Sequence, residues 1–294
     1  MDYKSTENWV LSRLPSYQAI GKKAYNPGLK NVVKFLSTIN LPIDSLNLIH
    51  VGGTNGKGST SSYISSILQE SNYQVGIFSS PHFFDFRERI KINNQKISKS
   101  FIVDFVNKYK SLIEELELSF FELSFCISLA YFVHNDVDYG VIEVGLGGRL
   151  DATNIINPLI SVITNISYDH TDILGNSLEM IALEKAGIFK KNSTIIVGER
   201  NDSVDEIFIN KANEVSSKIT FVPDYNDQKQ YSSVNYLNTN IKTAIYTCRA
   251  LNIENVDNNS IMTGISNINK NCHLIGRWSI LSENPRVIFD AAHN

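Results

Sequence analysis

The sequence has few cysteines, no long apolar segment and no excess of either charge. Three cysteines occur among 294 residues, and their wide spacing excludes a paired-cysteine metal or redox motif: Cys126, Cys248 and Cys272. No apolar run approaches the ~20 residues that cross a bilayer, and the N-terminus lacks the apolar core of a signal peptide. The 27 Lys and Arg nearly balance 30 Asp and Glu, so no nucleic-acid surface is expected. We therefore expect a cytoplasmic globular protein that acts neither on nucleic acid nor at a membrane.

Strand patterns and helix patterns alternate along the chain. Short apolar strands are predicted at 46–51, 75–80, 139–146, 159–166, 194–197 and 219–222, with a hairpin at 90–97. Helices are predicted at 101–113, 121–133, 178–189 and 204–215, and loops at 224–230 and 252–260. This alternation predicts an α/β protein of P-loop type, with a mainly parallel sheet and helices on both faces. In such sheets, ligands bind beyond the carboxyl ends of the strands.

The most informative segment is 46–59, which reads LNLIHVGGTNGKGS. Its apolar strand runs into a glycine-rich turn, whose backbone N–H groups can surround an anion, and a helix begins near Ser59, with its positive end toward that turn. Lys57 offers a cation and Ser59 a hydroxyl suited to Mg²⁺. The pattern departs from the standard P-loop because Gly58 separates Lys57 from Ser59 and because Val51 replaces a glycine. A nucleotide-phosphate site is favoured over a glycine turn without a ligand.

Two polar residues follow neighbouring predicted strands at this same edge of the sheet. Glu143 ends one strand and His170 follows the next, so both are candidate metal ligands beside the phosphate loop. Histidine is an unusual ligand for Mg²⁺ and a more natural one for Mn²⁺, and a purely structural role for His170 is the alternative. From pattern alone, Lys185 is predicted to be a solvated lysine that stabilises a helix end.

Six motifs occur in a fixed order: GTNGKGS, SSPHFFDFRERIKIN, EVGLGGRLDATN, YDHTDILG, EKAGIFK and DAAHN. Together they resemble the folylpolyglutamate synthase/dihydrofolate synthase family of the Mur ligase superfamily, from about residue 11 to the last residue. The resemblance implies an ATP-binding N-terminal/central domain over 1–284. It implies that 285–294 begins a C-terminal glutamate-ligase domain that is otherwise missing. We therefore expect the chain as it stands to bind ATP weakly and to ligate nothing.

The activity that the resemblance implies is ATP-dependent ligation through an acyl phosphate. L-glutamate would be joined to a pterin-bearing carboxylate, either dihydropteroate, a folyl-polyglutamate or both, by a monomeric enzyme that uses small-molecule substrates. Two alternatives stay open at this point. One is a Mur-type ligase of peptidoglycan precursors, and the other is a nucleotide-binding module without catalytic activity.

The resemblance also implies roles for individual residues. Lys57, Lys185 and His170 would be catalytic, and Lys185 would be carbamylated and help to position the second of two Mg²⁺ ions. The metal ligands would be Ser59, Ser80, Glu143 and His170. ATP would contact Gly53, Thr54, Asn55, Gly56, Lys57, Gly58, Ser59, Asp290 and His293. The pterin substrate would contact Ser119, Phe120, Phe121, Glu122, Leu150, Asp151 and Ala152, and more loosely the segment 18–29.

Overall fold

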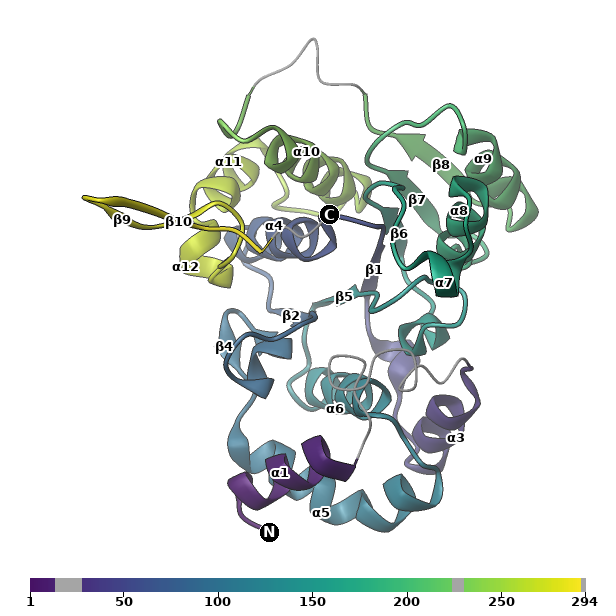
Figure 1. The fold of residues 1–294 in the computed structure, drawn as a ribbon, viewed down its shortest axis with the longest axis vertical. Helices are drawn as coiled ribbons and strands as arrows, with labels where there is room; N and C mark the ends of the chain where they lie inside the picture. The colour runs from purple at the N-terminus through teal and green to yellow at the C-terminus, as the bar shows by residue number, and fades with distance from the viewer. Residues whose placement is uncertain (14–27, 224–229, 292–294) are drawn as a thin grey trace.

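A mainly parallel sheet of eight strands forms the centre of the molecule (Figure 1). The computed structural model describes residues 1–13, 28–223 and 230–291. The strand order is β4-β3-β2-β5-β1-β6-β7-β8. The strands are β1 (Leu48–Gly52), β2 (Val75–Phe78), β3 (Ile90–Ile92), β4 (Gln95–Lys96), β5 (Tyr139–Glu143), β6 (Ile160–Ile163), β7 (Thr194–Val197) and β8 (Lys218–Phe221). The five neighbouring pairs β2–β5, β5–β1, β1–β6, β6–β7 and β7–β8 are parallel, whereas β3 pairs antiparallel with both β2 and β4 at one edge. The predicted fold class is confirmed.

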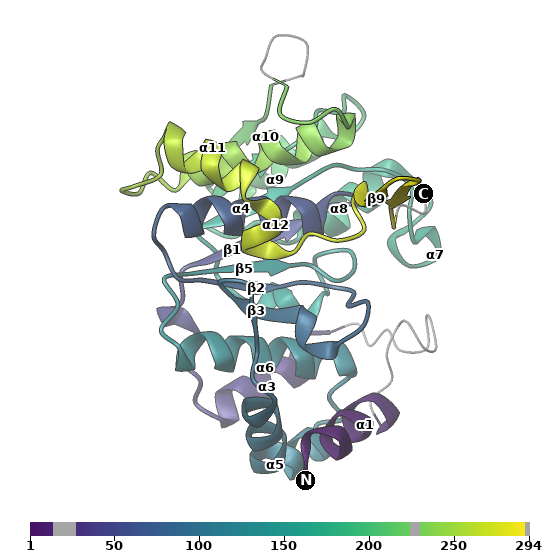
Figure 2. The ribbon, with the colours of Figure 1, turned by 90° about the vertical axis from the view of Figure 1, so that its left-hand side faces the viewer.

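Helices cover both faces of this sheet (Figure 2). The α-helices are α1 (Tyr3–Arg13), α3 (Lys30–Thr38), α4 (Lys57–Glu70), α5 (Lys99–Glu115), α6 (Phe120–His134), α7 (Thr171–Leu174), α8 (Leu178–Ala186), α9 (Asp205–Glu214), α10 (Asn235–Ala250), α11 (Asn258–Ser266) and α12 (Ile268–Cys272). Short 3₁₀ turns are η2 (Ile43–Ser45), η3 (Phe86–Arg89) and η4 (Ala152–Ile155). Within the described ranges, each helix is too short or too polar to span a membrane.

Successive side chains of the buried strands pack against helices on opposite faces of the sheet. Ile49 and Val51 of β1 pack into one apolar cluster with α4, α10 and α11, whereas Leu48 packs with α3, α5 and α6 on the opposite face. In β6, Val162 joins the first cluster and Ile163 joins a third one formed with α8 and α9. Successive strand residues point to opposite faces, so α4 and α10 lie opposite α6 and α8. This arrangement leaves the carboxyl edge of β1, β5 and β6 open to loops.

Several predicted boundaries shift because turn residues end the elements early. The strand expected at 139–146 stops at Glu143 before a glycine-rich turn, and the helix expected at 178–189 stops at Ala186 before Gly187. The loop expected at 252–260 is wrong at its end, because α11 begins at Asn258. There the Asp257 side chain accepts a hydrogen bond from the Ser260 N–H at 2.8 Å and caps the start of the helix. The loop expected at 224–230 lies almost wholly outside the described residues.

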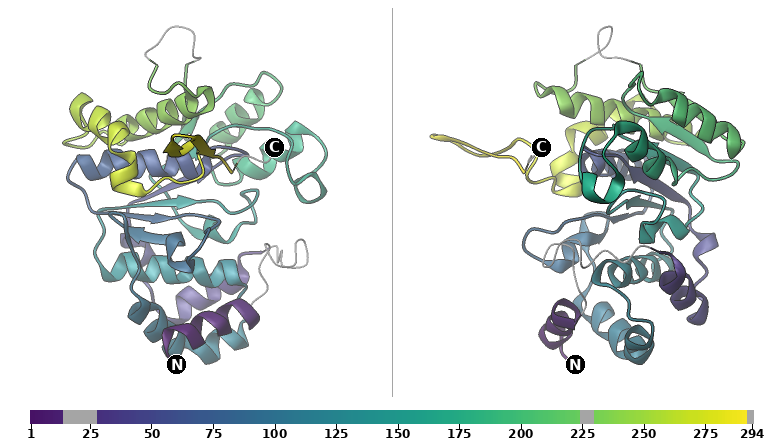
Figure 3. Two further views of the ribbon diagram at one scale, coloured as in Figure 1. Left: turned by 60° about the vertical axis from the view of Figure 1, so that its left-hand side comes forward. Right: turned by 45° about the vertical axis from the view of Figure 1, so that its right-hand side comes forward.

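The last described strands form a separate hairpin. β9 (Ser279–Glu283) and β10 (Arg286–Phe289) pair antiparallel with each other and project away from the helices and the large sheet (Figure 3). The apolar strand expected from 285 onward is therefore present, but it does not join the main sheet. The predicted domain boundary at 284/285 falls in the turn of this hairpin.

Candidate nucleotide and metal site

The phosphate loop joins β1 to α4 at the carboxyl edge of the sheet. Gly53 and Gly56 have positive φ values of 137° and 78°, a region that L side chains rarely adopt. A Cβ at Gly53 would collide with Thr164, and one at Gly56 would collide with the Asn240 side chain. Helix α4 then begins at Lys57, two residues before the expected Ser59. The two glycines are needed for both the turn and its close packing.

The segment that follows β6 fixes the shape of this loop. The backbone N–H of Thr54 donates to the Asn165 carbonyl at 3.0 Å, and the N–H of Asn55 donates to Asn165 Oδ1 at 2.9 Å. The Thr54 hydroxyl donates to the Ser167 carbonyl at 3.2 Å. The ends of β1 and β6 therefore form one ordered rim.

Two lysines converge on a single carbonyl of the phosphate loop. Lys57 Nζ donates to the Gly53 carbonyl at 3.1 Å and to the Thr54 carbonyl at 3.0 Å. Lys185 Nζ donates to the same Gly53 carbonyl at 2.9 Å. The interpretation of Lys185 as a solvated lysine is wrong, because its side chain is only 4% exposed. Helix α8 packs on the sheet, which turns its last residues inward toward the loop.

Burial and like charge shift the titration of these lysines. Burial, followed by the neighbouring Lys57 ammonium, lowers the pKa of Lys185 to about 7. Burial also lowers the pKa of Lys57, while the carboxylates of Glu143 and Asp169 oppose that change. At neutral pH a large share of the Lys185 amine is therefore uncharged.

A buried carboxylate lies beside this cationic loop. Glu143 ends β5 with 4% exposure, and its Oε2 accepts a hydrogen bond from the Ser80 N–H at 3.0 Å. Burial raises the pKa of Glu143, and the Lys57 charge opposes that rise. A methyl group added to Gly58 would lie 3.5 Å from Glu143 Oε1, so glycine at 58 keeps the space beside this carboxylate free of a side chain.

The Ser59 hydroxyl fits a divalent cation. Its Oγ lies in the first turn of α4, is fully buried, and has no hydrogen-bond partner among the described residues. Buried polar atoms in folded proteins are nearly always satisfied. A hydroxyl oxygen without a hydrogen-bond partner, close to a buried carboxylate and to the phosphate loop, suits a hard cation bound to phosphate.

His170 is linked to the phosphate loop through its neighbour Asp169, whose charge acts on Lys57 and Lys185. It caps the start of α7 with φ 46°, its N–H donates to Asp169 Oδ1 at 2.8 Å, and its Nε2 lies 3.6 Å from Asp169 Oδ2. No cluster of three or more His, Cys, Asp or Glu side chains suited to a metal occurs in the part of the chain that the structure describes. The metal-ligand roles expected for Glu143 and His170 therefore stay predictions.

The two segments predicted to bind the pterin substrate meet at Gly145. A Cβ there would collide with the Phe121 ring and would lie 3.1 Å from Asp151 Oδ2. Ser119 and Glu122 form a capping box at the start of α6, in which the Ser119 N–H donates to Glu122 Oε2 at 2.7 Å. The other residues predicted in these segments are buried or half-buried: Phe120, Leu150 and Ala152.

At the hairpin end of the site, Asp290 accepts hydrogen bonds from the Tyr236 hydroxyl at 2.6 Å and from the Trp278 N–H at 3.0 Å. His293 lies outside the described residues, as does most of the predicted segment 18–29. The sequence interpretation missed Arg277, whose charge acts on both Lys57 and Glu143. It also missed Asp169 and Asn240.

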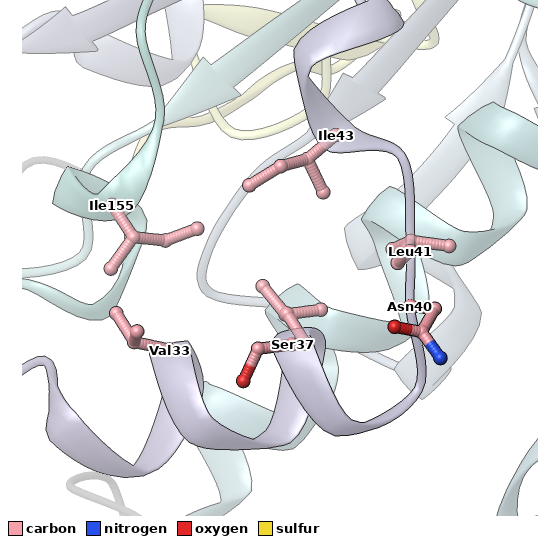
Figure 4. Close-up of a pocket in the computed structure, with 7 residues that line it drawn as sticks. Val33, Ser37, Asn40, Leu41, Ile43 and Ile155 are labelled. Carbon is pink, nitrogen blue, oxygen red and sulfur yellow. The ribbon is translucent and has the colours of Figure 1, made fainter.

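A pocket of the described chain lies away from this loop (Figure 4). It encloses about 410 Å³ between α3, η2 and η4. Ile43 precedes β1 whereas the phosphate loop follows it, so the pocket and the loop lie at opposite ends of that strand. Its lining has no charged side chain: Val33, Leu36, Ser37, Asn40, Leu41, Ile43 and Ile155. We assign no chemistry to it.

A parallel sheet with a glycine-rich loop between its central strand and a helix defines a nucleotide-binding α/β protein. Residues 51–272 match the Mur ligase middle domain family. A dihydrofolate synthase/folylpolyglutamate synthase of Bacillus subtilis (strain 168) is 32% identical over an alignment of 323 residues, gaps included. The alignment covers 99% of this chain and 73% of that protein. An Escherichia coli relative solved in complex with DHPP and ADP is 31% identical, with a TM-score of 0.82, over 100% of this chain and 72% of its own.

A bifunctional folylpolyglutamate synthase/dihydrofolate synthase solved with Mn, AMPPNP and L-glutamate is 28% identical. Its TM-score is 0.83, and the match covers 100% of this chain and 73% of that one. This chain therefore belongs to the dihydrofolate synthase/folylpolyglutamate synthase family of Mur ligases. Its class is that of an ATP-dependent ligase.

Proposed function

We propose that this protein joins L-glutamate to a pterin-bearing carboxylate, dihydropteroate or a folyl-polyglutamate, at the expense of ATP. The observation that carries the proposal is the meeting of Lys57, Lys185 and Glu143 around the phosphate loop. Relatives solved with ADP and DHPP, or with Mn, AMPPNP and L-glutamate, support the choice of substrates. Membership in the folate branch also favours it over peptidoglycan precursors.

The chemistry needs charge neutralisation more than it needs a strong base. A carboxylate oxygen of the pterin substrate attacks the γ-phosphorus of ATP, and ADP leaves. The amino group of glutamate then attacks the carbonyl carbon of the acyl phosphate, and phosphate leaves. Phosphoryl transfer depends mainly on positioning and on electrostatic stabilisation. Lys57 and the loop N–H groups other than those of Thr54 and Asn55, which donate to Asn165, supply these for the β- and γ-phosphates, and the neighbouring Arg277 adds positive charge.

Mg²⁺ would be held by Ser59, Ser80, Glu143 and His170, and it would supply charge neutralisation at the phosphates. The unpartnered Ser59 Oγ and the buried Glu143 carboxylate support this assignment. We propose two ions, the second positioned with the help of a carbamate on Lys185. An amine adds CO₂ only when neutral, and a pKa of about 7 makes a large share of Lys185 neutral near physiological pH.

The remaining assignments concern substrates and context. Phe121 and Asp151 would contact the pterin substrate, as would the rest of the segments 119–122 and 150–152, and Asp290 and His293 would meet the nucleotide. We propose that the hairpin around residue 285 is the junction with a C-terminal glutamate-ligase unit. The three cysteines are buried and unpaired, which fits activity in the cytoplasm, and we propose a monomer.

The test is ATP-dependent release of phosphate by the full-length protein. Release that requires both L-glutamate and a pterin carboxylate is the expected result. Dihydropteroate and tetrahydrofolate are compared as acceptors, and mass spectrometry of the product checks that one glutamate has been added. A protein that binds ATP but releases no phosphate with either acceptor would be a nucleotide-binding module instead.

A further inference from the structure

A buried histidine links the strand before the phosphate loop to the loop that carries Asp151. His50 lies in β1, is 0% exposed, and its Nε2 is 2.8 Å from Thr153 Oγ1. The Thr153 hydroxyl is hydrogen-bonded in turn to Asp151 Oδ1, which also accepts from the Thr153 N–H at 3.0 Å. The other oxygen, Asp151 Oδ2, accepts from the Leu146 N–H at 2.9 Å.

The number of protons available fixes which group donates in each of these hydrogen bonds. A hydroxyl has a single proton and an ionised carboxylate only accepts, so beside an ionised Asp151 the Thr153 hydroxyl donates to Asp151 and accepts from His50. His50 therefore carries its proton on Nε2. Its Nδ1 has no hydrogen-bond partner among the described residues. In the opposite tautomer Nδ1–H would be a buried donor without an acceptor, and Thr153 could no longer donate to Asp151, which is the costlier arrangement.

The surroundings keep this imidazole neutral. Burial, together with the Lys190 ammonium, lowers the pKa of His50 to about 3. Lys190 is itself held by the Asn154 carbonyl at 2.7 Å, next to Thr153 in the chain. A neutral ring with one fixed N–H is a donor whose protonation state does not change near neutral pH.

We propose that His50 is a positioning residue that orients the Asp151 carboxylate, through Thr153, toward the pterin-bearing substrate. The inference rests on the proposed function for the identity of that substrate. Asp151 Oδ2 faces Gly145 beside the Phe121 ring, so its orientation decides which N–H groups of a flat heterocycle it can accept from. Without His50, the Thr153 hydroxyl oxygen would lose the donor that fixes its rotation, so its hydrogen bond to Asp151 would be held less firmly.

The experiment compares paired variants in the full-length protein. His50→Leu and Thr153→Val remove the donor and the relay with little change in volume, whereas His50→Gln and Thr153→Ser keep them. We expect the first pair to raise the KM for the pterin acceptor roughly tenfold, as for loss of one hydrogen bond, with the KM for ATP unchanged. The second pair should stay near the wild type, and the double variant His50→Leu/Thr153→Val should be no worse than either single one.

A merely structural role would instead lower the unfolding midpoint and leave both KM values unchanged, or move them together. Either result overturns the inference while leaving ligation, and so the proposed function, intact. A measurement on the unaltered protein covers variants that fail to fold: ¹⁵N NMR of the histidine rings should show His50 protonated on Nε2 alone through the neutral range. A proton on Nδ1 overturns the inference even if the protein ligates nothing.

Discussion

Replacing Lys185 by Met should stabilise the protein in a way that depends on pH. The pKa of Lys185 falls from 10.5 to about 7 on folding. Since one pKa unit corresponds to about 1.4 kcal/mol, protonating this amine costs on the order of 5 kcal/mol more in the folded protein than in the unfolded chain. Below pH 7 both states are protonated, so the wild type bears the whole cost. As pH rises from 7 toward 10.5 the cost shrinks, because only the unfolded chain still binds the proton.

We therefore expect Lys185→Met to raise the free energy of unfolding at about pH 6, and to raise it less at about pH 9, by a difference of roughly 2–3 kcal/mol. Loss of the hydrogen bond to the Gly53 carbonyl subtracts about 1 kcal/mol at both pH values. Urea unfolding in CO₂-free buffer measures this, with Lys191→Met as the control because Lys191 is exposed. An equal gain at both pH values would refute the reasoning.

Three further predictions concern activity and metal binding. Lys57→Ala should lower kcat/KM for ligation by roughly a hundredfold or more, about 3 kcal/mol, as for loss of one transition-state donor; turnover equal to that of Lys191→Ala contradicts the role. Gly58→Ala should leave the urea midpoint unchanged but weaken Mn²⁺ binding on the order of tenfold, because the methyl group covers Glu143; titration calorimetry measures it, and unchanged affinity counts against the assignment. Lys185→Ala should lose ligation and regain part of it with acetate, and full activity without acetate excludes a required carbamate.

The fold could largely be predicted from the sequence, because the apolar runs and the spacing of apolar residues that mark strands and helices are local features of the chain. The apolar runs of β1, β5 and β6 are continuous, as strands covered on both faces must be, and each ends in a turn that the sequence marks with glycine or asparagine. Contacts between distant segments are not local. Lys185 reads as a solvated helix end, yet it reaches a carbonyl 132 positions away.

The site residues that the sequence interpretation missed are also brought into place by contacts between distant segments. Asn240 packs against Gly56 only because α10 crosses α4, and Arg277 reaches Lys57 only after the chain passes α12. His50 looks like one more residue of an apolar strand, and its partner Thr153 follows a different strand. No spacing in the sequence marks such pairs, whereas the glycine-rich loop is marked by its own composition.

The proposed function requires that one rim of the sheet binds a metal–nucleotide complex. A crystal structure of the protein with Mn²⁺ and AMPPNP tests it most directly, since anomalous scattering locates the metal. We predict Mn²⁺ between Ser59 Oγ and the Glu143 carboxylate, with the β- and γ-phosphates in the loop 53–59. Nucleotide and metal bound at another surface, with Ser59 and Glu143 free of both, would contradict the account.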